Sequence, residues 1–234
     1  MPTPMYMPDV LRGASLCVYK GEFYCLLGGN GTGKTTTLNV LAGLNRAYRG
    51  KVRIAGRPIG DYKNGALYRG NLALLPQNPQ TVFVRDCLRD DLVELLEAQG
   101  VAKDEREKRI AAVAEKLGIV PLLDKPPYDL SGGEQQKCAI AKMLLLEPKI
   151  LLLDEPLGAL DLRLRKDMQN ELKRIQQAMG ITFIYVTHDQ EEALSMSDTV
   201  VVMSEGKIHQ IGTPIDIYNE PQNAFVADFI GESN

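Results

Sequence analysis

One short stretch of sequence, Gly28-Gly29-Asn30-Gly31-Thr32-Gly33-Lys34-Thr35, decides the fold because it fits the pattern G-x-x-x-x-G-K-[ST]. Apolar residues 23–27 precede it, and residues 38–44 follow it with leucines at helical spacing. A glycine-rich loop between a buried strand and a helix presents backbone amides and the positive end of the helix dipole to an anion. The stretch therefore predicts a phosphate-binding loop, in which Lys34 reaches the β- and γ-phosphates of a nucleotide and the Thr35 hydroxyl ligates Mg²⁺.

Strands and helices alternate along the rest of the chain. Further strands are expected at 15–18, 150–153 and 181–187, with β-hairpins at 51–59 and 199–211. Helices are expected at 88–96, 110–117, 131–147 and 164–179. This alternation predicts an α/β fold with a mixed, largely parallel core sheet, an antiparallel β arm and a helical middle part. The charge run at 103–109 is interpreted as the solvated face of a helix.

Composition excludes several classes of protein. The chain of 234 residues is 44% apolar and 24% charged, which is typical of a globular protein and not of a disordered or fibrous one. A net charge of −3 argues against a dedicated nucleic-acid-binding protein. No apolar run approaches the roughly 18 residues of a membrane span, and Met1-Pro2-Thr3-Pro4 does not resemble a signal peptide. The four cysteines lack CxxC spacing and are interpreted as free, mostly buried thiols in a reducing cytosol.

Two carboxylates, Asp154 and Glu155, end the apolar strand at 150–153. In nucleotide hydrolases with a phosphate loop, the first acid holds Mg²⁺ and the second orients or deprotonates the attacking water. Taken alone, the pair would equally suit the cap of a strand. The phosphate loop on the same chain favours the catalytic interpretation.

A second anion site is indicated at Leu130-Ser131-Gly132-Gly133-Glu134-Gln135, where a serine and two glycines open a helix in a capping-box pattern. One nucleotide cannot occupy two such sites far apart in one chain unless two chains meet. The stretch therefore indicates a dimer with composite sites, and an ordinary capped helix is the simpler alternative. His188 follows the strand at 181–187 and can hydrogen-bond a γ-phosphate, although a lone histidine is more often structural. Gln77 is, from its chemistry alone, only a loop glutamine.

Taken in order, these motifs resemble those of the nucleotide-binding subunit of an ATP-binding cassette (ABC) transporter. Walker A is 28–35, the Q-loop glutamine is Gln77, the signature is 130–135, Walker B is 150–154 followed by Glu155, the D-loop is 158–161 and the H-loop is His188. The signature departs from the family pattern, which has a plain glutamine where this chain has Glu134-Gln135. The resemblance implies a P-loop NTPase core, with 1–234 as one nucleotide-binding domain and a helical subdomain, about 82–148, inserted in it.

The resemblance also implies a site shared by two chains in a head-to-tail dimer that holds two ATP molecules. From one chain, ATP would contact the Walker A residues Gly28, Gly29, Asn30, Gly31, Thr32, Gly33, Lys34, Thr35 and Thr36. From the other chain, it would contact the signature and D-loop residues Ser131, Gly132, Gly133, Glu134 and Asp161. Mg²⁺ would be held by Thr35, Gln77 and Asp154, and catalysis would fall to Glu155, His188, Lys34 and Gln77. Tyr6 is the candidate for the aromatic residue that stacks on adenine, with a frayed terminus as the alternative.

The implied function is ATP hydrolysis that powers solute import. The chain would sit on the cytoplasmic face of the membrane as a peripheral subunit, paired with a second ATPase subunit and with membrane-spanning partners, and would bind no nucleic acid. A DNA-repair ATPase of the same superfamily is disfavoured, because only 97 positions separate Lys34 from Ser131 and they lack sustained heptads. A P-loop ATPase domain without a transport partner, engineered or mosaic, is the other alternative.

The two parts of the chain resemble different importers. Residues 1–155 resemble energy-coupling-factor ATPases of vitamin and cobalt importers, whereas 154–234 resemble the ATPase of spermidine/putrescine importers. A mosaic or engineered chimera joined near Asp154 would explain this division, and a natural ATPase with mixed features is the alternative. Because 78–91 follows the Q-loop glutamine and resembles the energy-coupling-factor type, partners of that type are expected.

Overall fold

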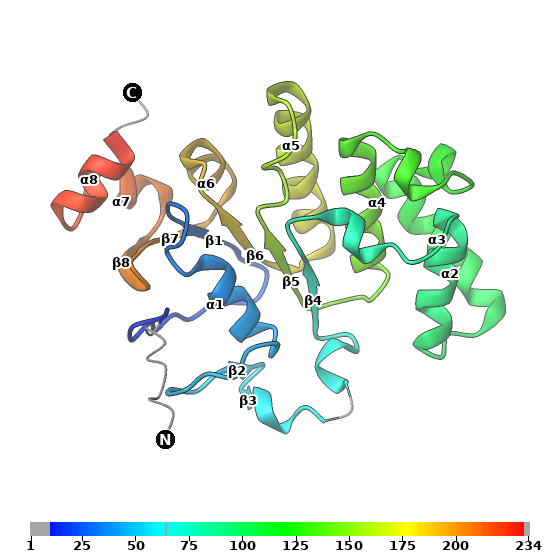
Figure 1. Cartoon of the computed structure of the whole chain (residues 1–234), viewed down its shortest axis with the longest axis horizontal. Helices are drawn as coiled ribbons and strands as arrows, with labels where there is room; N and C mark the ends of the chain where they lie inside the picture. The colour runs from blue at the N-terminus through cyan, green and yellow to red at the C-terminus, as the bar shows by residue number, and fades with distance from the viewer. Residues whose placement is uncertain (1–9, 64, 232–234) are drawn as a thin grey trace, which may run out of the picture.

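The computed structural model describes residues 10–63 and 65–231, and a six-stranded sheet lies at its centre (Figure 1). The strand order is β4-β5-β6-β1-β7-β8. Neighbouring strands are parallel from β4 to β7, and only β8 runs antiparallel, against β7. Their bounds are β1 Phe23–Leu27, β4 Leu72–Leu75, β5 Ile150–Asp154, β6 Thr182–Thr187, β7 Thr199–Ser204 and β8 Lys207–Gly212. This mixed, largely parallel sheet confirms the expected fold class.

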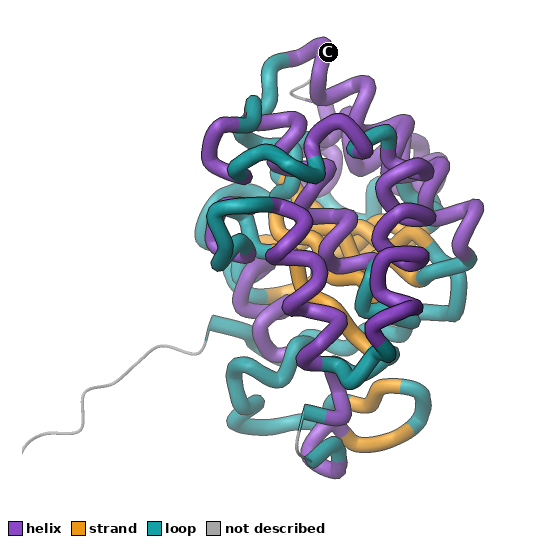
Figure 2. Tube along the Cα trace, turned by 90° about the vertical axis from the view of Figure 1, so that its right-hand side faces the viewer, coloured by secondary structure: helices purple, strands orange, loops and turns teal. Residues whose placement is uncertain are grey.

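Helices cover both faces of the sheet and extend beyond its β4 edge (Figure 1). Their bounds are α1 Lys34–Leu41, α2 Leu88–Ala98, α3 Lys103–Leu117, α4 Gly132–Leu144, α5 Leu162–Met179, α6 Gln190–Met196, α7 Pro214–Asn219 and α8 Ala224–Gly231. Figure 2 shows the helices beyond the edge as a layer in front of the strands. The antiparallel arm is confirmed as a short hairpin of β2 (Arg53–Ile54) and β3 (Arg57–Pro58).

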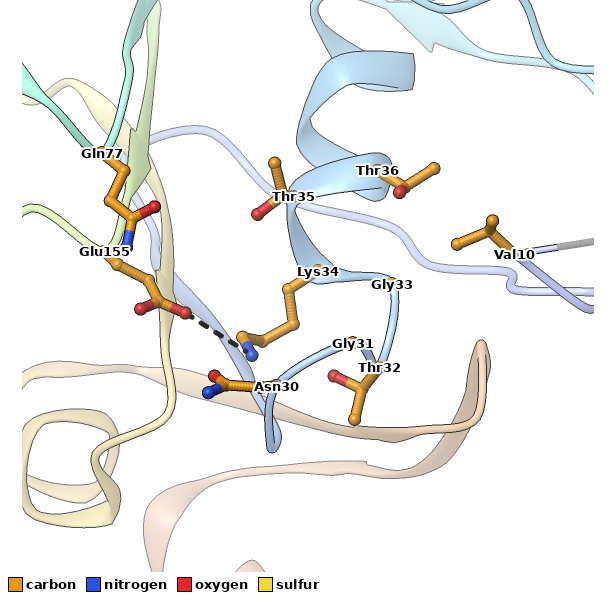
Figure 3. Close-up of a pocket in the computed structure, with 10 residues that line it drawn as sticks. All are labelled: Val10, Asn30, Gly31, Thr32, Gly33, Lys34, Thr35, Thr36, Gln77 and Glu155. Atoms are coloured by element: carbon orange, nitrogen blue, oxygen red, sulfur yellow. Dashed lines mark ion pairs between the residues drawn. The ribbon is translucent and has the colours of Figure 1, made fainter.

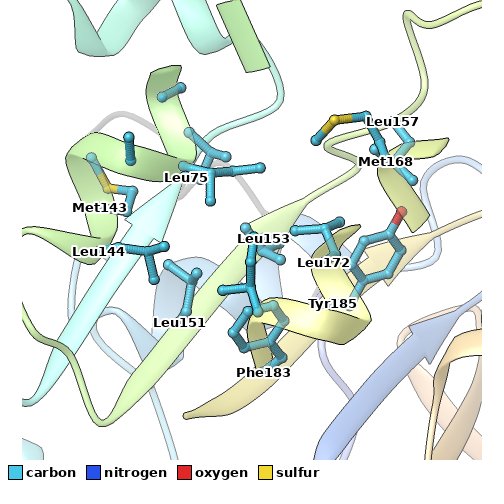
Figure 4. Packing of buried hydrophobic residues seen from close by; sticks show 14 of the residues in the cluster. Leu75, Met143, Leu144, Leu151, Leu153, Leu157, Met168, Leu172, Phe183 and Tyr185 are labelled. Carbon is cyan, nitrogen blue, oxygen red and sulfur yellow. The ribbon is translucent and has the colours of Figure 1, made fainter. Parts of the chain in front are cut away.

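Every residue of β1 is buried, because alternate side chains enter different apolar clusters. Phe23 belongs to the larger cluster and Tyr24 to the smaller one, which also contains Leu38 of α1. In Figure 4 the strand residues of the larger cluster face methionines and leucines of α4 and α5. This packing fixes the C-terminal end of β1, where the phosphate loop begins.

Several local expectations were wrong or incomplete. Residues 15–18 pair with no strand among the described residues, although Leu16 and Val18 pack at the edge of the smaller cluster as an alternating strand would. Leu44 lies beyond α1, because the chain leaves the helix at Gly43, whose φ is +74°. The strand β4 and the helices α6 to α8 were not expected. All four cysteines are free, but Cys17 is exposed, so "mostly buried" overstates their burial.

A buried ion pair joins α2 to α4 beyond the sheet. Lys142 Nζ lies 2.5 Å from Asp91 Oδ2, and both residues are buried. The other oxygen of Asp91 accepts hydrogen bonds from the backbone amides of Val84 and Arg85. Lys142 also donates to the carbonyl of Val82. The pair therefore anchors the irregular segment between β4 and α2 to the helix that begins at the signature.

We expect Lys142→Met to lower the free energy of unfolding by about 3–5 kcal/mol, because it leaves the Asp91 carboxylate buried without its cation. Arg85→Ala is the matched control. It breaks an ion pair with Glu94 that is open to solvent, so its effect should be far smaller. Urea unfolding of both variants measures the difference, and an equal loss of stability would contradict the anchoring role of the buried pair.

Candidate functional site

The phosphate loop begins where β1 ends, and close approach requires glycine there. A Cβ atom on Gly28 would lie 2.3 Å from the Met203 carbonyl oxygen of β7. Gly31 and Gly33 have φ values of +75° and +97°, which L-residues with side chains rarely adopt. Because the glycines permit this path, the loop curls over the end of the sheet and enters α1 directly.

The backbone amides of residues 30–33 donate to no atom of the described part of the chain. They border a pocket of about 430 Å³, and no acidic residue lies in the first turn of α1. Figure 3 shows residues 30–36 along one side of this pocket, with Gln77 and Glu155 opposite. Free amides at the start of a helix fit the phosphates of a nucleotide.

Lys34 places its ammonium inside this loop. Its Nζ donates to the carbonyls of Gly28 and Gly29, at 2.7 Å each, and lies 3.6 Å from Glu155 Oε1 (Figure 3). Burial lowers the pKa of Lys34, while the Glu155 carboxylate opposes that shift. A buried ammonium with one carboxylate neighbour has the charge and reach to bind phosphate oxygens.

Oxygen ligands suited to a magnesium ion meet beside Lys34. The hydroxyl of Thr35 donates to Asp154 Oδ1 at 3.1 Å, which joins α1 to the end of β5. Burial raises the pKa of Asp154, and the hydrogen bond from Thr35 opposes this shift. Gln77, in the segment after β4, lines the same pocket. A hydroxyl, a carboxylate and an amide carbonyl are the hard donors that Mg²⁺ accepts, so these three residues fit the ion.

Glu155 and His188 form the second polar pair of the site. Glu155 Oε2 lies 3.1 Å from His188 Nδ1, which places the end of β5 beside the residue that follows β6. The Glu155 side chain is 14% exposed and lines the pocket, whereas that of His188 is 53% exposed. Glu155 also has a φ of +42°, an uncommon conformation that concentrates at functional sites. The carboxylate can accept a proton from a water in the pocket.

The signature residues lie elsewhere in the chain. Ser131 to Glu134 open α4, and none of them lines the pocket of the phosphate loop. The Glu134 carboxylate accepts hydrogen bonds from both the amide and the hydroxyl of Ser131, and these bonds lower its pKa. Gly133 packs against α5, where an added Cβ would lie 2.5 Å from Leu164 Cδ2. Asp161 caps α5 through the amide of Leu164 and is also outside the pocket.

Two features of the site had not been expected. Val10 lines the pocket, because the next residues lie against the β7–β8 turn, where the Arg12 amide donates to the Gly206 carbonyl. Arg165 connects the segment before α5 to the residue after His188, since it donates to the Leu160 carbonyl and to Asp189. Neither contact carries a signal in the sequence, because each joins segments that are far apart along the chain. Tyr6, the candidate for adenine stacking, lies outside the described residues.

No helix among the described residues is long and apolar enough to cross a membrane.

The chain is 49% identical over 230 residues to the spermidine/putrescine import ATP-binding protein PotA of Bacteroides fragilis, and 48% identical over 231 residues to PotA of Clostridioides difficile. Each match covers 96% of this chain but only 48% and 64% of the relative, so the chain spans about half to two thirds of their length.

A solved structure, CbiO1 from Clostridium perfringens, described as part of the ABC transporter complex cbiONQ, is 30% identical with a TM-score of 0.83. The match covers 96% of this chain and 87% of CbiO1. Both resemblances seen in the sequence are therefore present, but the suspected joint near Asp154 gains no support, because each match runs through nearly the whole chain. The pattern of the ABC transporter family matches residues 11–158. With the phosphate loop and the paired acids in place, this match shows that the chain belongs to the ABC transporter family.

Proposed function

We propose that the chain is the ATP-binding and ATP-hydrolysing subunit of an importer. One observation carries the proposal: Glu155 lies at the pocket of the phosphate loop, within 3.6 Å of the Lys34 ammonium and 3.1 Å of His188. A base and a cation thus line the same pocket as the free loop amides, and a histidine contacts the base. Phosphoryl transfer needs positioned charge and an oriented water more than covalent help, and this site supplies both.

Each residue then has a separate task. The loop amides and Lys34 bind the β- and γ-phosphates and balance the charge that develops on them. Thr35, Asp154 and Gln77 would hold Mg²⁺, which would supply positive charge to the phosphates of the nucleotide. Glu155 accepts a proton from the attacking water, and His188 orients Glu155 and contacts the γ-phosphate.

A second copy or a similar subunit completes the site. Ser131, Gly132, Gly133 and Glu134 lie at the start of α4 and do not line the pocket of their own chain, so in this proposal they serve the nucleotide of a facing chain, together with Asp161. The chain acts as one nucleotide-binding domain over 1–234, in which about 82–148 forms the helical subdomain. It works at the inner face of the membrane and binds no nucleic acid.

The membrane partners are of the spermidine/putrescine permease type. PotA proteins from two organisms match nearly all of this chain at 48–49% identity, including the segment 78–91 after the Q-loop glutamine. Energy-coupling-factor subunits are the second candidate, because the local resemblance of 78–91 and the similarity to CbiO1 favour them. The transported solute is selected by the partner, so the partner test also decides the solute class.

We expect Glu155→Gln to retain ATP binding and to lose hydrolysis by roughly 100-fold or more, because an amide cannot accept the proton of the attacking water. Steady-state phosphate release measures the loss, and gel filtration with ATP should show a stabilised dimer. Glu115→Gln, an exposed change on α3, is the matched control and should hydrolyse ATP at the normal rate. Near-normal turnover of Glu155→Gln would exclude this residue as the base.

Ser131→Arg tests the composite site. The large cation would block the γ-phosphate of the facing chain, so hydrolysis should be lost while ATP binding by dilute monomer stays within about twofold of normal. Ala112→Arg, an exposed change on α3, controls for the added charge. Equal loss of monomer binding and hydrolysis in Ser131→Arg would contradict a site shared between chains.

Parallel co-expression with polyamine permease subunits and with an energy-coupling-factor transmembrane subunit tests the partner. We expect stable capture by the polyamine permease, because a docking surface is specified by the segment in contact and by its few buried anchors. Preferential capture by the energy-coupling-factor subunit would assign the chain to the second partner class. Failure of both, with ATP hydrolysis intact, would contradict the import proposal.

A further inference from the structure

Positive charge is concentrated in one part of the fold. Residues 44–68, here called the basic arm, hold the β2–β3 hairpin and the turns on either side of it. The arm contains six cations and a single acid, Asp61. The cations are Arg46, Arg49, Lys51, Arg53, Arg57 and Lys63. Because the whole chain has a net charge of −3, the residues outside the arm are distinctly acidic.

These cations lack acidic partners of their own. All six are exposed, and none forms an ion pair within the described residues, whereas cations of the helical region and of α5 are paired repeatedly. Arg57 stacks over the Tyr62 ring and donates to the Asp61 carbonyl, and Arg49 lies over the Tyr48 ring. Unpaired surface cations at this density create a positive field that attracts an anionic partner.

The arm also exposes apolar and aromatic side chains among its cations. Tyr48 is 86% exposed and Leu44 is 60% exposed, both within a few positions of Arg46 and Lys51. Between these turns and the end of α1 lies a hollow of about 730 Å³, which Arg46, Lys51 and Arg53 border. Tyrosine rings and long basic side chains suit the boundary of a bilayer, where a ring can enter the headgroup layer while cations remain with the phosphates.

The position of the arm leaves it free for a partner. The β2–β3 hairpin lies at the lower edge of the molecule in Figure 1, away from α8 at the upper left and from α2 and α3 at the right. Figure 2 shows the β2–β3 loop projecting at the same end. None of its residues lines the pocket of the phosphate loop, so contact there would not obstruct the nucleotide.

We infer that the basic arm is a docking surface for the anionic phospholipid headgroups of a membrane. The six cations contact lipid phosphates, and Leu44 and Tyr48 enter the headgroup layer. Each cation near an anionic surface raises the constant for partitioning of the chain from water onto the membrane by about fivefold. The arm therefore supplies a second attachment to the membrane beside that through a membrane-spanning partner. A nucleic acid is the less favoured partner, because the chain as a whole is acidic and the arm exposes Leu44 among its cations. This inference does not require the proposed hydrolysis, since the surface acts without nucleotide.

Flotation of the full chain without ATP tests the inference. Vesicles of equal parts phosphatidylglycerol and phosphatidylcholine should bind the chain at low salt, and pure phosphatidylcholine vesicles should bind it at least about tenfold less. About 0.5 M NaCl should release it, because the attraction is screened. Binding that is equal on both vesicles, or that is insensitive to salt, would overturn the inference.

Matched variants locate the surface. Arg46→Glu, Lys51→Glu and Arg53→Glu combined should weaken partitioning at least about 100-fold, whereas Lys103→Glu, Lys108→Glu and Lys116→Glu on α3 make the same charge change and should have little effect. The double variant Leu44→Ser, Tyr48→Ser should weaken partitioning onto anionic vesicles by about tenfold and leave the salt dependence of that partitioning intact. Equal losses in the two charge variants would show a general charge effect and contradict the inference.

Two competitors distinguish other anions. Inorganic phosphate, at an ionic strength matched with NaCl, should displace the chain no better than NaCl does. A double-stranded DNA oligonucleotide should bind more weakly than the anionic vesicles. Displacement by phosphate beyond that by NaCl would show that the hollow binds a small anion. Tighter binding of DNA would show that the arm binds nucleic acid. Either result would overturn the inference that the arm docks on lipid.

Discussion

The site depends on how the positive charge of one buried ammonium, that of Lys34, is compensated by its neighbours. Lys34 lies among two loop carbonyls and the Glu155 carboxylate, in a loop whose amides at residues 30–33 have no partner among the described residues. Burial alone would favour the neutral amine, and Glu155 counteracts it. The same carboxylate is the proposed base, so the cation that binds phosphate and the group that acts on water hold each other in place. In the proposed function, an arriving phosphate would compete for Lys34 and free Glu155 for its water.

The sheet brings these groups together because its strands are parallel. β1, β5 and β6 lie side by side and end at the same edge, so the residues that follow them, Gly28, Glu155 and His188, converge although they are far apart in sequence. A second network supports this edge. Arg165 binds the Leu160 carbonyl and Asp189, so it joins the segment before α5 to the residue after His188. The geometry of the histidine is thus coupled to the part of the chain that would face a second subunit.

Much of this arrangement follows from sequence alone. A glycine-rich loop between a buried strand and a helix specified Lys34 and Thr35, and the acids after the strand at 150–153 had to reach the same edge. The positive φ of Glu155 and the contact of Val10 could not be foreseen, because both depend on tertiary packing against β6 and the β7–β8 turn. The ion pair of Asp91 and Lys142 joins residues whose spacing carries no signal. The proposed partner of Ser131 is a nucleotide bound to another chain, which the fold of a single chain does not contain.

The central claim is that nucleotide is hydrolysed in sites completed by a second subunit, and the rate of ATP hydrolysis per chain as a function of protein concentration tests it most directly. If the site is composite, the rate per chain rises with concentration while monomers predominate and levels off when dimers form, over a range of about 100-fold in concentration. A rate per chain that stays constant down to concentrations at which gel filtration shows only monomer would contradict the account, because the pocket of a single chain would then suffice.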